Sequence, residues 1–303
     1  LCDATPVSFC TIGRRSSAGS SADVRNYETF EDSPFTELNG GYVIGATPFA
    51  TRTRRLNGVE FDTVIFDEAS QITLPLAMMG MLVAKRALFI GDHKQLPPVL
   101  TARHREAWFR ASVFGMLVGR RFDTMLEETY RMNAELTEWP SQQYYSGQLR
   151  CASETIAQRR IAYMRLPMRF DTILDPEAPK VFVDLGHRNA TTNSTAEASL
   201  ICDLIAELLA CGIEPDEIGV VTPYRAQART IRNLLRSMIP DGEQRRKIVV
   251  DTVERMQGQE RDVIFLSLTT SNPAFAAGIA DFFLQPERLN VAITRARVKL
   301  IIV

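Results

Sequence analysis

The feature that most constrains the fold of this chain is a series of short apolar runs, many of which end in Gly, Asp, Thr or Pro. Several runs are rich in β-branched residues, which is typical of strands buried on both faces of a parallel sheet. Helical patterns lie between some of them, at Thr195–Cys211 and Ala226–Met238. The predicted strands are Tyr42–Ala46, Thr63–Phe66, Ala87–Ile90, Val181–Leu185, Ile218–Val221, Ile248–Val250, Val263–Leu268 and Leu300–Val303.

The alternation of strands and helices predicts an α/β fold with mainly parallel sheets. The strands fall into two groups, one before about residue 121 and one after about residue 178. We therefore expect two α/β domains, residues 1–121 and 122–303, the second beginning with a helical junction. Residues 1–40 are rich in Ser, Gly, Thr and Asp and are expected to be loop-rich.

Composition narrows the class of protein. The 303 residues are 45% hydrophobic and 23% charged, which allows substantial cores, and the net charge of -1 gives no global basic field. The five cysteines form no C-x-x-C pair and the three histidines lie far apart, which argues against a zinc site or a disulfide framework. The apolar runs are too short to span a membrane and no signal peptide is visible, so we expect an intracellular protein, cytoplasmic and bacterial.

The two ends of the chain predict a fragment of a longer protein. The chain starts at Leu1 rather than Met and stops at Val303, inside an apolar run. A buried strand is a poor place for a natural terminus. Additional domains or protein partners are therefore expected outside these residues.

An acidic pair comes directly after the first well-defined strand. The apolar run up to Phe66 leads into Asp67 and Glu68, and functional groups in open parallel sheets gather at the carboxyl ends of strands. An Asp at such a place can hold Mg²⁺ through its water shell, and a neighbouring Glu can orient and deprotonate an attacking water. The alternative is an acidic strand end on a solvated loop.

The next strand ends in Gly91–Pro98, a more specific segment. The glycine permits a sharp exit and the two prolines stiffen the end of the segment. Gln95 carries both a donor and an acceptor, so it can contact a terminal phosphate and the attacking water together. The alternative is a rigid turn.

Further blocks lie at the predicted junction and at later strand ends. Arg131 can stabilise charge on a transferring phosphoryl group, and Tyr130 offers a flat face for a base. Threonine hydroxyls and helix-start amides at strand ends suit sugar–phosphate backbones. The alternatives are surface charge, a core tyrosine and helix N-capping. The later blocks are Gly219–Gln227, Val250–Asp262 and Glu287–Arg297, the last of which contains Arg295 as a second phosphate-directed arginine.

Taken in this order, the blocks resemble superfamily 1 helicases, most closely the branch that contains the nonsense-mediated-decay helicases and their bacterial relatives. The resemblance covers roughly residues 41–303. It implies two RecA-like domains, the first one incomplete in this chain, with ATP between them. It also implies ATP and Mg²⁺ as cofactors and single-stranded nucleic acid as partner, with no membrane.

The resemblance assigns roles to individual residues. By analogy with the family, Asp67 would bind Mg²⁺, Glu68 would be the catalytic carboxylate and Gln95 would sense the phosphate. Around the nucleotide, Tyr130 would stack near the adenine, Arg131 and Arg295 would reach the γ-phosphate, and Glu260 in the block with Gly258 would face the ribose. The residues in blocks that touch the nucleic-acid strand are Thr47, Thr222, Pro223, Tyr224 and Thr252.

The chain departs from the family in one respect. The family's G-x-x-x-x-G-K-[ST] loop cradles the phosphates, and this chain contains no Gly-Lys dipeptide. The nearest candidate, Gly13–Ser21, has glycines at the wrong spacing and no Lys. We expect the loop to lie upstream in the parent protein, so that this chain alone binds ATP poorly or not at all and is inactive by itself.

The predicted function is the motor portion of an ATP-dependent helicase or translocase on single-stranded DNA or RNA. The Thr-Pro-Tyr block at Thr222–Tyr224 resembles the branch that moves 5′ to 3′. One alternative is a non-enzymatic nucleic-acid-binding or scaffold protein that has lost its motor, as the absent phosphate loop suggests. Another is a motor fused to a nuclease or other effector domain outside these residues.

Overall fold

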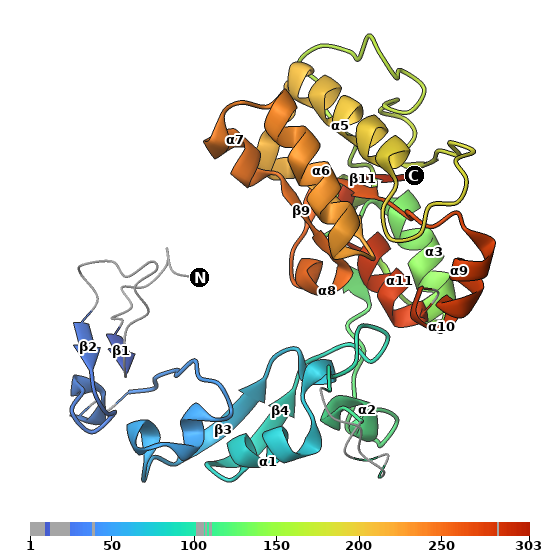
Figure 1. The fold of residues 1–303 in the computed structure, drawn as a ribbon. Helices are drawn as coiled ribbons and strands as arrows, with labels where there is room; N and C mark the ends of the chain where they lie inside the picture. The colour runs from blue at the N-terminus through green and yellow to red at the C-terminus, as the bar shows by residue number, and fades with distance from the viewer. Residues whose placement is uncertain are drawn as a thin grey trace. The chain divides into compact units, whose positions relative to one another are not determined.

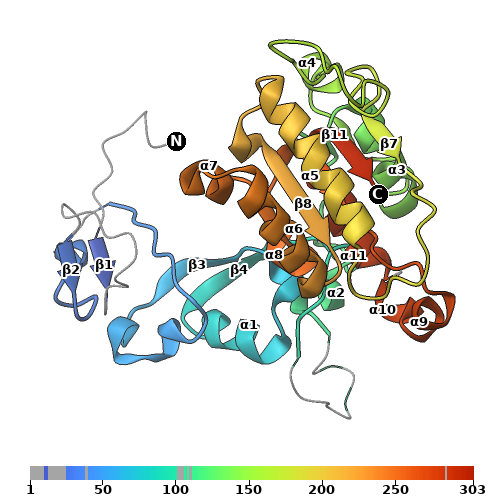
Figure 2. The same cartoon turned by 45° about the horizontal axis from the view of Figure 1, so that its top comes forward.

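The computed structural model describes residues 10–12, 25–37, 40–100, 106, 108, 111–283 and 285–303. The chain divides into two compact units. Unit 1 comprises residues 1–93 and 97–123, and unit 2 comprises residues 94–96 and 124–303. Figures 1 and 2 show the elements of each unit. The division after residue 123 lies two residues from the expected boundary, but the short segment 94–96 belongs to unit 2.

Unit 1 is built on a pair of parallel strands, β3 (Phe61–Phe66) and β4 (Ala84–Phe89). Helix α1 (Leu74–Met81) connects them and packs on both. Phe66 and Phe89 are register partners whose rings stack with centroids 4.9 Å apart. Gly80 lets the helix approach this pair, because a Cβ at Gly80 would lie 2.8 Å from the Phe66 ring.

The remaining described elements of unit 1 are short. The strands β1 (Cys10–Ile12) and β2 (Arg25–Tyr27) pair in parallel, within a region expected to be loop-rich. The candidate loop Gly13–Ser21 lies outside the described residues. The other elements are the 3₁₀ helices η1 (Pro34–Glu37), η2 (Ala50–Arg52), η3 (Arg54–Leu56) and η4 (Ala69–Gln71), and helix α2 (Val113–Leu117).

The predicted strand Tyr42–Ala46 is wrong. This stretch has no regular secondary structure, and Val43 is 98% exposed. Tyr42 instead places its ring against Phe30 and Phe61, with centroids 5.4 and 6.5 Å away. An apolar run becomes a strand only where a neighbouring strand accepts its backbone hydrogen bonds, and none of the described strands pairs with this run.

Unit 2 contains a five-stranded, wholly parallel sheet in the order β7-β11-β10-β8-β9. The α/β fold with mainly parallel sheets is therefore confirmed. The expected strand Val181–Leu185 is shorter in the structure, and Leu300–Val303 is the end of a longer strand. The strands are β7 (Lys180–Phe182), β8 (Ile218–Thr222), β9 (Val249–Thr252), β10 (Arg261–Leu266) and β11 (Ala296–Ile302).

Helices cover both faces of this sheet. Alternate residues of β10 point to opposite sides: Phe265 belongs to one buried cluster and Ile264 to the other. The first cluster includes apolar residues of α5 (Thr195–Ala210) and α6 (Arg225–Met238), and the second includes those of α3 (Ala134–Tyr144) and α11 (Pro286–Ile293). Burial on both faces explains why these strands are continuous apolar runs in the sequence.

Smaller elements complete unit 2. The strands β5 (Glu128–Thr129) and β6 (Arg150–Cys151) pair in parallel beside α3. Each of the other short helices lies before or after a strand of the large sheet or in the junction. They are α4 (Glu154–Ala157), η6 (Pro215–Glu217), α7 (Gly242–Lys247), α8 (Val253–Met256), α9 (Pro273–Gly278) and α10 (Ala280–Phe283).

Candidate nucleotide and nucleic-acid sites

In unit 1 the acidic pair lies where β3 ends beside the end of β4. The Ile90 amide donates to the Phe66 carbonyl and the Ala69 amide donates to the Ile90 carbonyl, both at 2.8 Å. Gly91 then passes so close to the turn that a Cβ there would lie 2.9 Å from the Ser70 nitrogen. These contacts place the Asp67–Glu68 turn directly beside the chain leaving β4, as the position of both motifs at strand ends predicts.

The turn itself is strained. Glu68 has φ 51° and ψ 41°, a left-handed conformation that costs a non-glycine residue on the order of 1 kcal/mol. Its amide donates to Asp67 Oδ1 at 3.0 Å, and its Oε2 accepts from Gln71 Nε2 at 3.4 Å. Asp67 is exposed and Glu68 half-buried. Both carboxylates therefore lie where solvent and a ligand can reach them.

An exposed carboxylate at a strand end suits Mg²⁺, which keeps most of its waters and binds one or two protein carboxylates. Asp67 has this character. Among the described residues, no group of three or more His, Cys, Asp or Glu side chains could hold a metal ion by itself.

Gln95 lies in the short segment that packs with unit 2. The carbonyl of Lys94 accepts from Asn290 Nδ2 at 3.0 Å, and Leu96 is 6% exposed within the second buried cluster. Gln95, between them, is half-buried. The structure therefore holds the predicted phosphate sensor against α11 of unit 2, although the sequence assigned it to the first domain.

Three of the predicted nucleotide residues of unit 2 come together. Arg131 Nε lies 2.5 Å from Glu260 Oε2, and Arg131 Nη1 donates to the Thr294 carbonyl at 3.1 Å. The neighbouring Arg295 donates from Nη2 to Thr294 Oγ1 at 3.1 Å. Arg131, Glu260 and Arg295 thus belong to one cluster, which we call the arginine cluster together with Arg297.

The charges of this cluster act on the Glu260 carboxyl. Burial by itself raises the pKa of Glu260, but the hydrogen bond and charge of Arg131 and the charges of Arg297 and Arg295 outweigh it, so the pKa lies below its ordinary value. Arg297 Nη1 is 3.7 Å from Glu260 Oε1. Glu260 is therefore held as an anion whose oxygens accept from cations.

Arg295 is buried, whereas an arginine that contacts a phosphate must expose its guanidinium to the ligand. Its side chain is 1% exposed. Nε donates to the Val291 carbonyl at 2.9 Å and Nη1 to the Gln259 carbonyl at 3.3 Å. In this structure it joins the end of α11 to the Gln257–Glu260 turn. A γ-phosphate contact would require it to exchange these bonds, so that role stays a prediction.

Tyr130 and Gly258 flank the arginine cluster. Tyr130 is 72% exposed, so its ring is available for stacking. Gly258 has φ 78°, a conformation that L side chains rarely adopt, and the turn closes with the Gln259 amide donating to the Met256 carbonyl at 3.0 Å. The glycine is needed to bring Glu260 back toward Arg131.

The predicted nucleic-acid residues of unit 2 lie at the carboxyl ends of β8 and β9. Thr222 and Thr252 are register partners, but both are buried, with 0% and 6% exposure. Thr222 Oγ1 accepts from the Tyr224 amide at 3.4 Å and lies 3.3 Å from Thr269 Oγ1. The two threonines are therefore buried groups that support the backbone at the strand ends, whereas Pro223 and Tyr224 are half-buried and lie nearer to solvent.

Tyr224 is positioned by the loop after β10. Its hydroxyl accepts from Thr270 Oγ1 at 3.0 Å, and its ring centroid lies 6.4 Å from that of Phe275 in α9. In unit 1, Thr47 is exposed, and its carbonyl accepts from the Ala50 amide at 2.9 Å as η2 begins. Of the residues predicted to touch the nucleic acid, Thr47, Pro223 and Tyr224 are therefore at least partly exposed, whereas Thr222 and Thr252 are buried.

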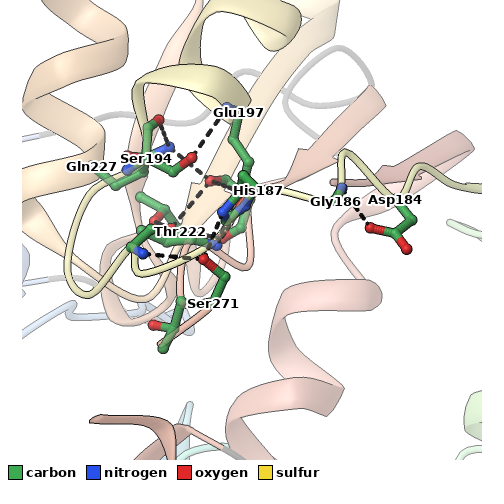
Figure 3. A network of polar contacts seen from close by, with 12 residues as sticks. Asp184, Gly186, His187, Ser194, Glu197, Thr222, Gln227 and Ser271 are labelled. Carbon is green, nitrogen blue, oxygen red and sulfur yellow. Dashed lines mark hydrogen bonds and ion pairs between the residues drawn. The ribbon is translucent and has the colours of Figure 1, made fainter. Parts of the chain in front are cut away.

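A buried polar network around Glu197 was not predicted from the sequence (Figure 3). Glu197 in the first turn of α5 is 2% exposed, and it accepts from Ser267 Oγ at 2.6 Å and from the Thr269 amide at 2.9 Å on each oxygen. His187 Nε2 lies 2.6 Å from Glu197 Oε1, and Nδ1 lies 2.7 Å from Ser271 Oγ. The network fixes the loop that positions Tyr224.

Gln227 extends this network. It is completely buried, and its Nε2 donates to Ser267 Oγ at 3.0 Å and to the Ser194 carbonyl at 3.1 Å. The Ser194 hydroxyl accepts from the Glu197 amide, so Ser194-Thr195-Ala196-Glu197 has the spacing of an ordinary capping box. The spacing in the sequence therefore predicts only a helix cap at Glu197. It does not predict the contacts of Glu197 with Ser267 and Thr269, which lie about 70 positions away.

Comparison with known proteins assigns the chain to a family. A family model described as an AAA domain matches residues 109–303, and a second model with the same description matches residues 19–103. The chain is similar to the regulator of nonsense transcripts 1 homolog of Neurospora crassa, with 32% identity over 88% of this chain. It is also similar to the DNA replication ATP-dependent helicase/nuclease DNA2 of Xenopus laevis, with 31% identity over 84% of this chain.

The chain belongs to the AAA-domain family of superfamily 1 helicases, in the branch of the nonsense-mediated-decay helicases. It spans about a quarter of the length of the curated relatives it matches, 24% and 25% for the two proteins above. Among solved structures, an arterivirus nonstructural protein 10 helicase aligns with 99% of this chain and 48% of its own, at 14% identity and a TM-score of 0.42.

Of the two relatives above, the DNA2 protein is named as an ATP-dependent helicase/nuclease. In the part of the chain that the structure describes, no helix is long and apolar enough to cross a membrane.

Proposed function

We propose that these residues form the motor portion of an ATP-dependent helicase or translocase that moves along single-stranded DNA or RNA in the 5′ to 3′ direction. The observation that carries the proposal is the ion pair between Arg131 and Glu260, which joins two motif residues 129 positions apart. The pair supports the proposal because it brings a candidate phosphate-directed arginine and a candidate ribose-binding carboxylate together, next to the exposed ring of Tyr130.

In the proposal, Arg131 acts on the nucleotide through its guanidinium, and Glu260 acts through hydrogen bonds to the ribose. Arg131 is held by Thr129 Oγ1, which accepts from its amide at 3.2 Å, and by Arg159, which donates to its carbonyl at 3.2 Å. A fixed backbone with a partly exposed side chain is what a phosphate-directed arginine requires, because the guanidinium can turn without disturbing the fold.

Asp67 and Glu68 supply the chemistry of hydrolysis in unit 1. Asp67 would bind Mg²⁺, and the metal would neutralise phosphate charge when bound. Glu68 would accept a proton from the attacking water. Gln71, which donates to Glu68 Oε2, holds that carboxylate in the strained turn. The Gly-Lys phosphate loop is absent from the sequence, so strong turnover is expected only of the full-length protein.

The single strand would contact Pro223 and Tyr224 in unit 2 and Thr47 in unit 1. Tyr224 is supported by Thr270 and Phe275, so its exposed side can stack on a base or touch the sugar–phosphate backbone. Backbone contacts and stacking recognise every base, so we expect low sequence preference. The 5′ to 3′ direction rests on the Thr-Pro-Tyr block at the end of β8.

The test is ATP hydrolysis by the full-length protein, measured alone and with single-stranded DNA or RNA. We expect either nucleic acid to stimulate turnover, and a directional strand-displacement assay to require a 5′ single-stranded tail. A protein that binds single strands but shows no stimulated hydrolysis would instead support the scaffold alternative, which the missing Gly-Lys dipeptide favours.

A further inference from the structure

Helix α6 carries a narrow stripe of arginines. Arg225, Arg229, Arg232 and Arg236 are all exposed. With 3.6 residues per turn, their spacing of four, three and four places them within an arc of about 60° over a length of about 16 Å. A solvated helix face usually mixes both signs of charge, whereas residues 225–238 contain no Asp or Glu at all.

The stripe lies along one edge of the large sheet. Strand β9 is the last strand of the order, and α6 packs on it. In Figure 1, α7 and α8 lie at the two ends of β9, with α6 alongside. Both short helices add exposed basic residues, namely Arg246 and Lys247 from α7 and Arg255 from α8.

Two contacts connect these side chains into one surface. Asp251 Oδ2 lies 3.5 Å from both Arg232 Nη2 and Arg255 Nη1, so α6 and α8 present their arginines side by side. The carboxylate neutralises only part of this charge, because residues 225–255 contain eight Arg or Lys and four Asp or Glu. We call Arg229, Arg232, Arg236, Arg246, Lys247 and Arg255 the basic edge.

The surplus of positive charge on the basic edge contrasts with a chain whose net charge is -1. The surface therefore attracts a polyanion locally although the protein as a whole does not. One backbone acceptor of the edge strand β9 is already occupied, because Arg232 Nε and Nη2 donate to the Val250 carbonyl at 3.0 and 2.8 Å. An added β-strand could not form its hydrogen bond there. The exposed guanidinium groups of this surface suit phosphate oxygens, which can accept from them bidentately.

The position of the basic edge indicates which polyanion it binds. Arg225 directly follows Thr222–Tyr224, the block that the proposed function assigns to the single strand. Arg255 follows Thr252 at the same offset, and the two threonines are register partners. A strand that passes Tyr224 therefore meets first Arg225 and then Arg255, which belongs to the basic edge.

We propose that the basic edge binds the phosphate backbone of the same nucleic-acid strand after it leaves Tyr224, as a second and sequence-independent contact. This inference rests on the proposed single-strand function. A stacked strand carries a phosphate about every 3.4 Å, so the stripe of about 16 Å faces about five phosphates. A strand too short to extend past Tyr224 does not reach this surface.

The test compares single strands of about 5 and about 30 nucleotides, bound over a range of salt concentrations to the full chain. The variant is the triple substitution Arg229→Gln, Arg236→Gln and Arg246→Gln, all at exposed positions outside the nucleotide and Tyr224 sites. We expect it to bind the long strand on the order of tenfold more weakly at low salt and to lower the salt slope by about 2. Its affinity for the short strand stays that of the wild type.

The matched control removes three exposed positive charges elsewhere in unit 2, by Arg165→Gln, Arg169→Gln and Lys180→Gln. It is expected to bind the long strand with the wild-type salt slope. Equal losses in both triples would overturn the inference, since they would indicate only a general effect of net charge. A loss confined to duplex of the same length would overturn the choice of a single strand.

The two proposals fail differently. If the wild-type protein binds both strands and the triple variant binds them equally well, the basic edge has no role and the proposed function stands. If the wild-type protein binds neither strand, the single-strand function fails, and this inference fails with it. Thermal unfolding of both triples, expected at the wild-type temperature, separates lost binding from lost folding.

Discussion

Arg131 and Glu260 form an ion pair across 129 positions of sequence, with Arg131 Nε 2.5 Å from Glu260 Oε2. The pair connects the junction after β5 to the turn before β10, and the Thr294 carbonyl accepts from the same guanidinium. A nucleotide that engages both residues would therefore have to replace one interaction by another. The ion pair holds the predicted phosphate contact, Arg131, and the predicted ribose contact, Glu260, next to each other in unit 2.

Substitution Arg131→Ala should separate catalysis from stability. The ion pair is partly exposed, so its loss should cost only about 1 kcal/mol in the free energy of unfolding. Loss of a phosphate-directed arginine should lower kcat by about 10³-fold or more. Turnover and urea unfolding of the full-length protein measure the two effects. Arg150→Ala, which removes an exposed arginine on β6, is the control; equal kcat values for both variants would contradict the role of Arg131.

Substitution Glu197→Ala should destabilise unit 2 severely. The carboxylate is buried and accepts from Ser267 Oγ and the Thr269 amide, and these donors would lose their partner. We expect a loss of about 3–5 kcal/mol in the free energy of unfolding, measured by urea denaturation. Glu154→Ala, at an exposed position in α4, should change it by less than about 0.5 kcal/mol. Similar free energies of unfolding for the two variants would show that the Glu197 network contributes little to stability.

Substitution Gly91→Ala should disturb the acidic turn. A Cβ at Gly91 would lie 2.9 Å from the Ser70 nitrogen and 3.1 Å from the Ala69 nitrogen, and backbone atoms cannot move aside cheaply. We expect a loss of stability of about 1–3 kcal/mol together with reduced turnover. The control is Gly45→Ala, where nothing lies within 4 Å of the added atom. Identical unfolding midpoints for both variants would show that the strand ends are not packed as described.

Lys299 should give the protein an unusual alkaline stability profile. It is 1% exposed, and its Nζ donates to the carbonyls of Asp175 and Ala178 at 2.8 and 2.6 Å. Burial lowers the pKa of Lys299 to about 8 from 10.5, against the charge of Asp175, which raises it. Between these values the unfolded chain holds a proton that the folded chain lacks, so stability rises with pH by up to about 3 kcal/mol.

The buried thiol of Cys202 has the opposite effect on the pH dependence of stability above pH 9.0. Burial, with the charge of Asp203, raises the pKa of Cys202 to about 12 from 9.0, so its contribution to stability falls as the pH rises above 9.0. The Lys299 effect is isolated by comparing the free energy of unfolding of the wild type with that of Lys299→Met. The difference should grow in favour of the wild type from about pH 8 to about pH 10.5. Parallel profiles would rule out a buried, shifted lysine.

The sequence predicts the fold of unit 2 well because its sheet is buried on both faces. Strands such as β8 and β10 are then continuous apolar runs, and their residues need no partner-specific pattern to be recognised. Tyr42–Ala46 shows the limit of this reasoning. It has the same texture, yet none of the described strands pairs with it and Val43 is exposed. Apolar character alone does not show whether a neighbouring strand exists.

The sequence predicts where the candidate site residues lie along the strands, but not which tertiary contacts they make. Strand-end position predicts a role for Asp67 and Glu68, because the carboxyl edge of a parallel sheet is where such groups act, and the structure places both directly after β3. The same rule marks Thr222 but cannot reveal that its hydroxyl is buried beneath Tyr224. The attachment of Lys94–Leu96 to α11 depends on tertiary contacts more than 190 positions apart, which no local pattern encodes.

Glu68 is proposed to orient and deprotonate the attacking water of ATP hydrolysis, and a single substitution tests this role. Glu68→Gln keeps the size of the side chain and an oxygen for Gln71, but removes the base. Single-strand-stimulated ATP hydrolysis of the full-length protein should fall by about 10²-fold or more while ATP binding is retained. Glu60→Gln, at an exposed position just before β3, should hydrolyse ATP like the wild type. Wild-type turnover in Glu68→Gln would show that Glu68 is not the base.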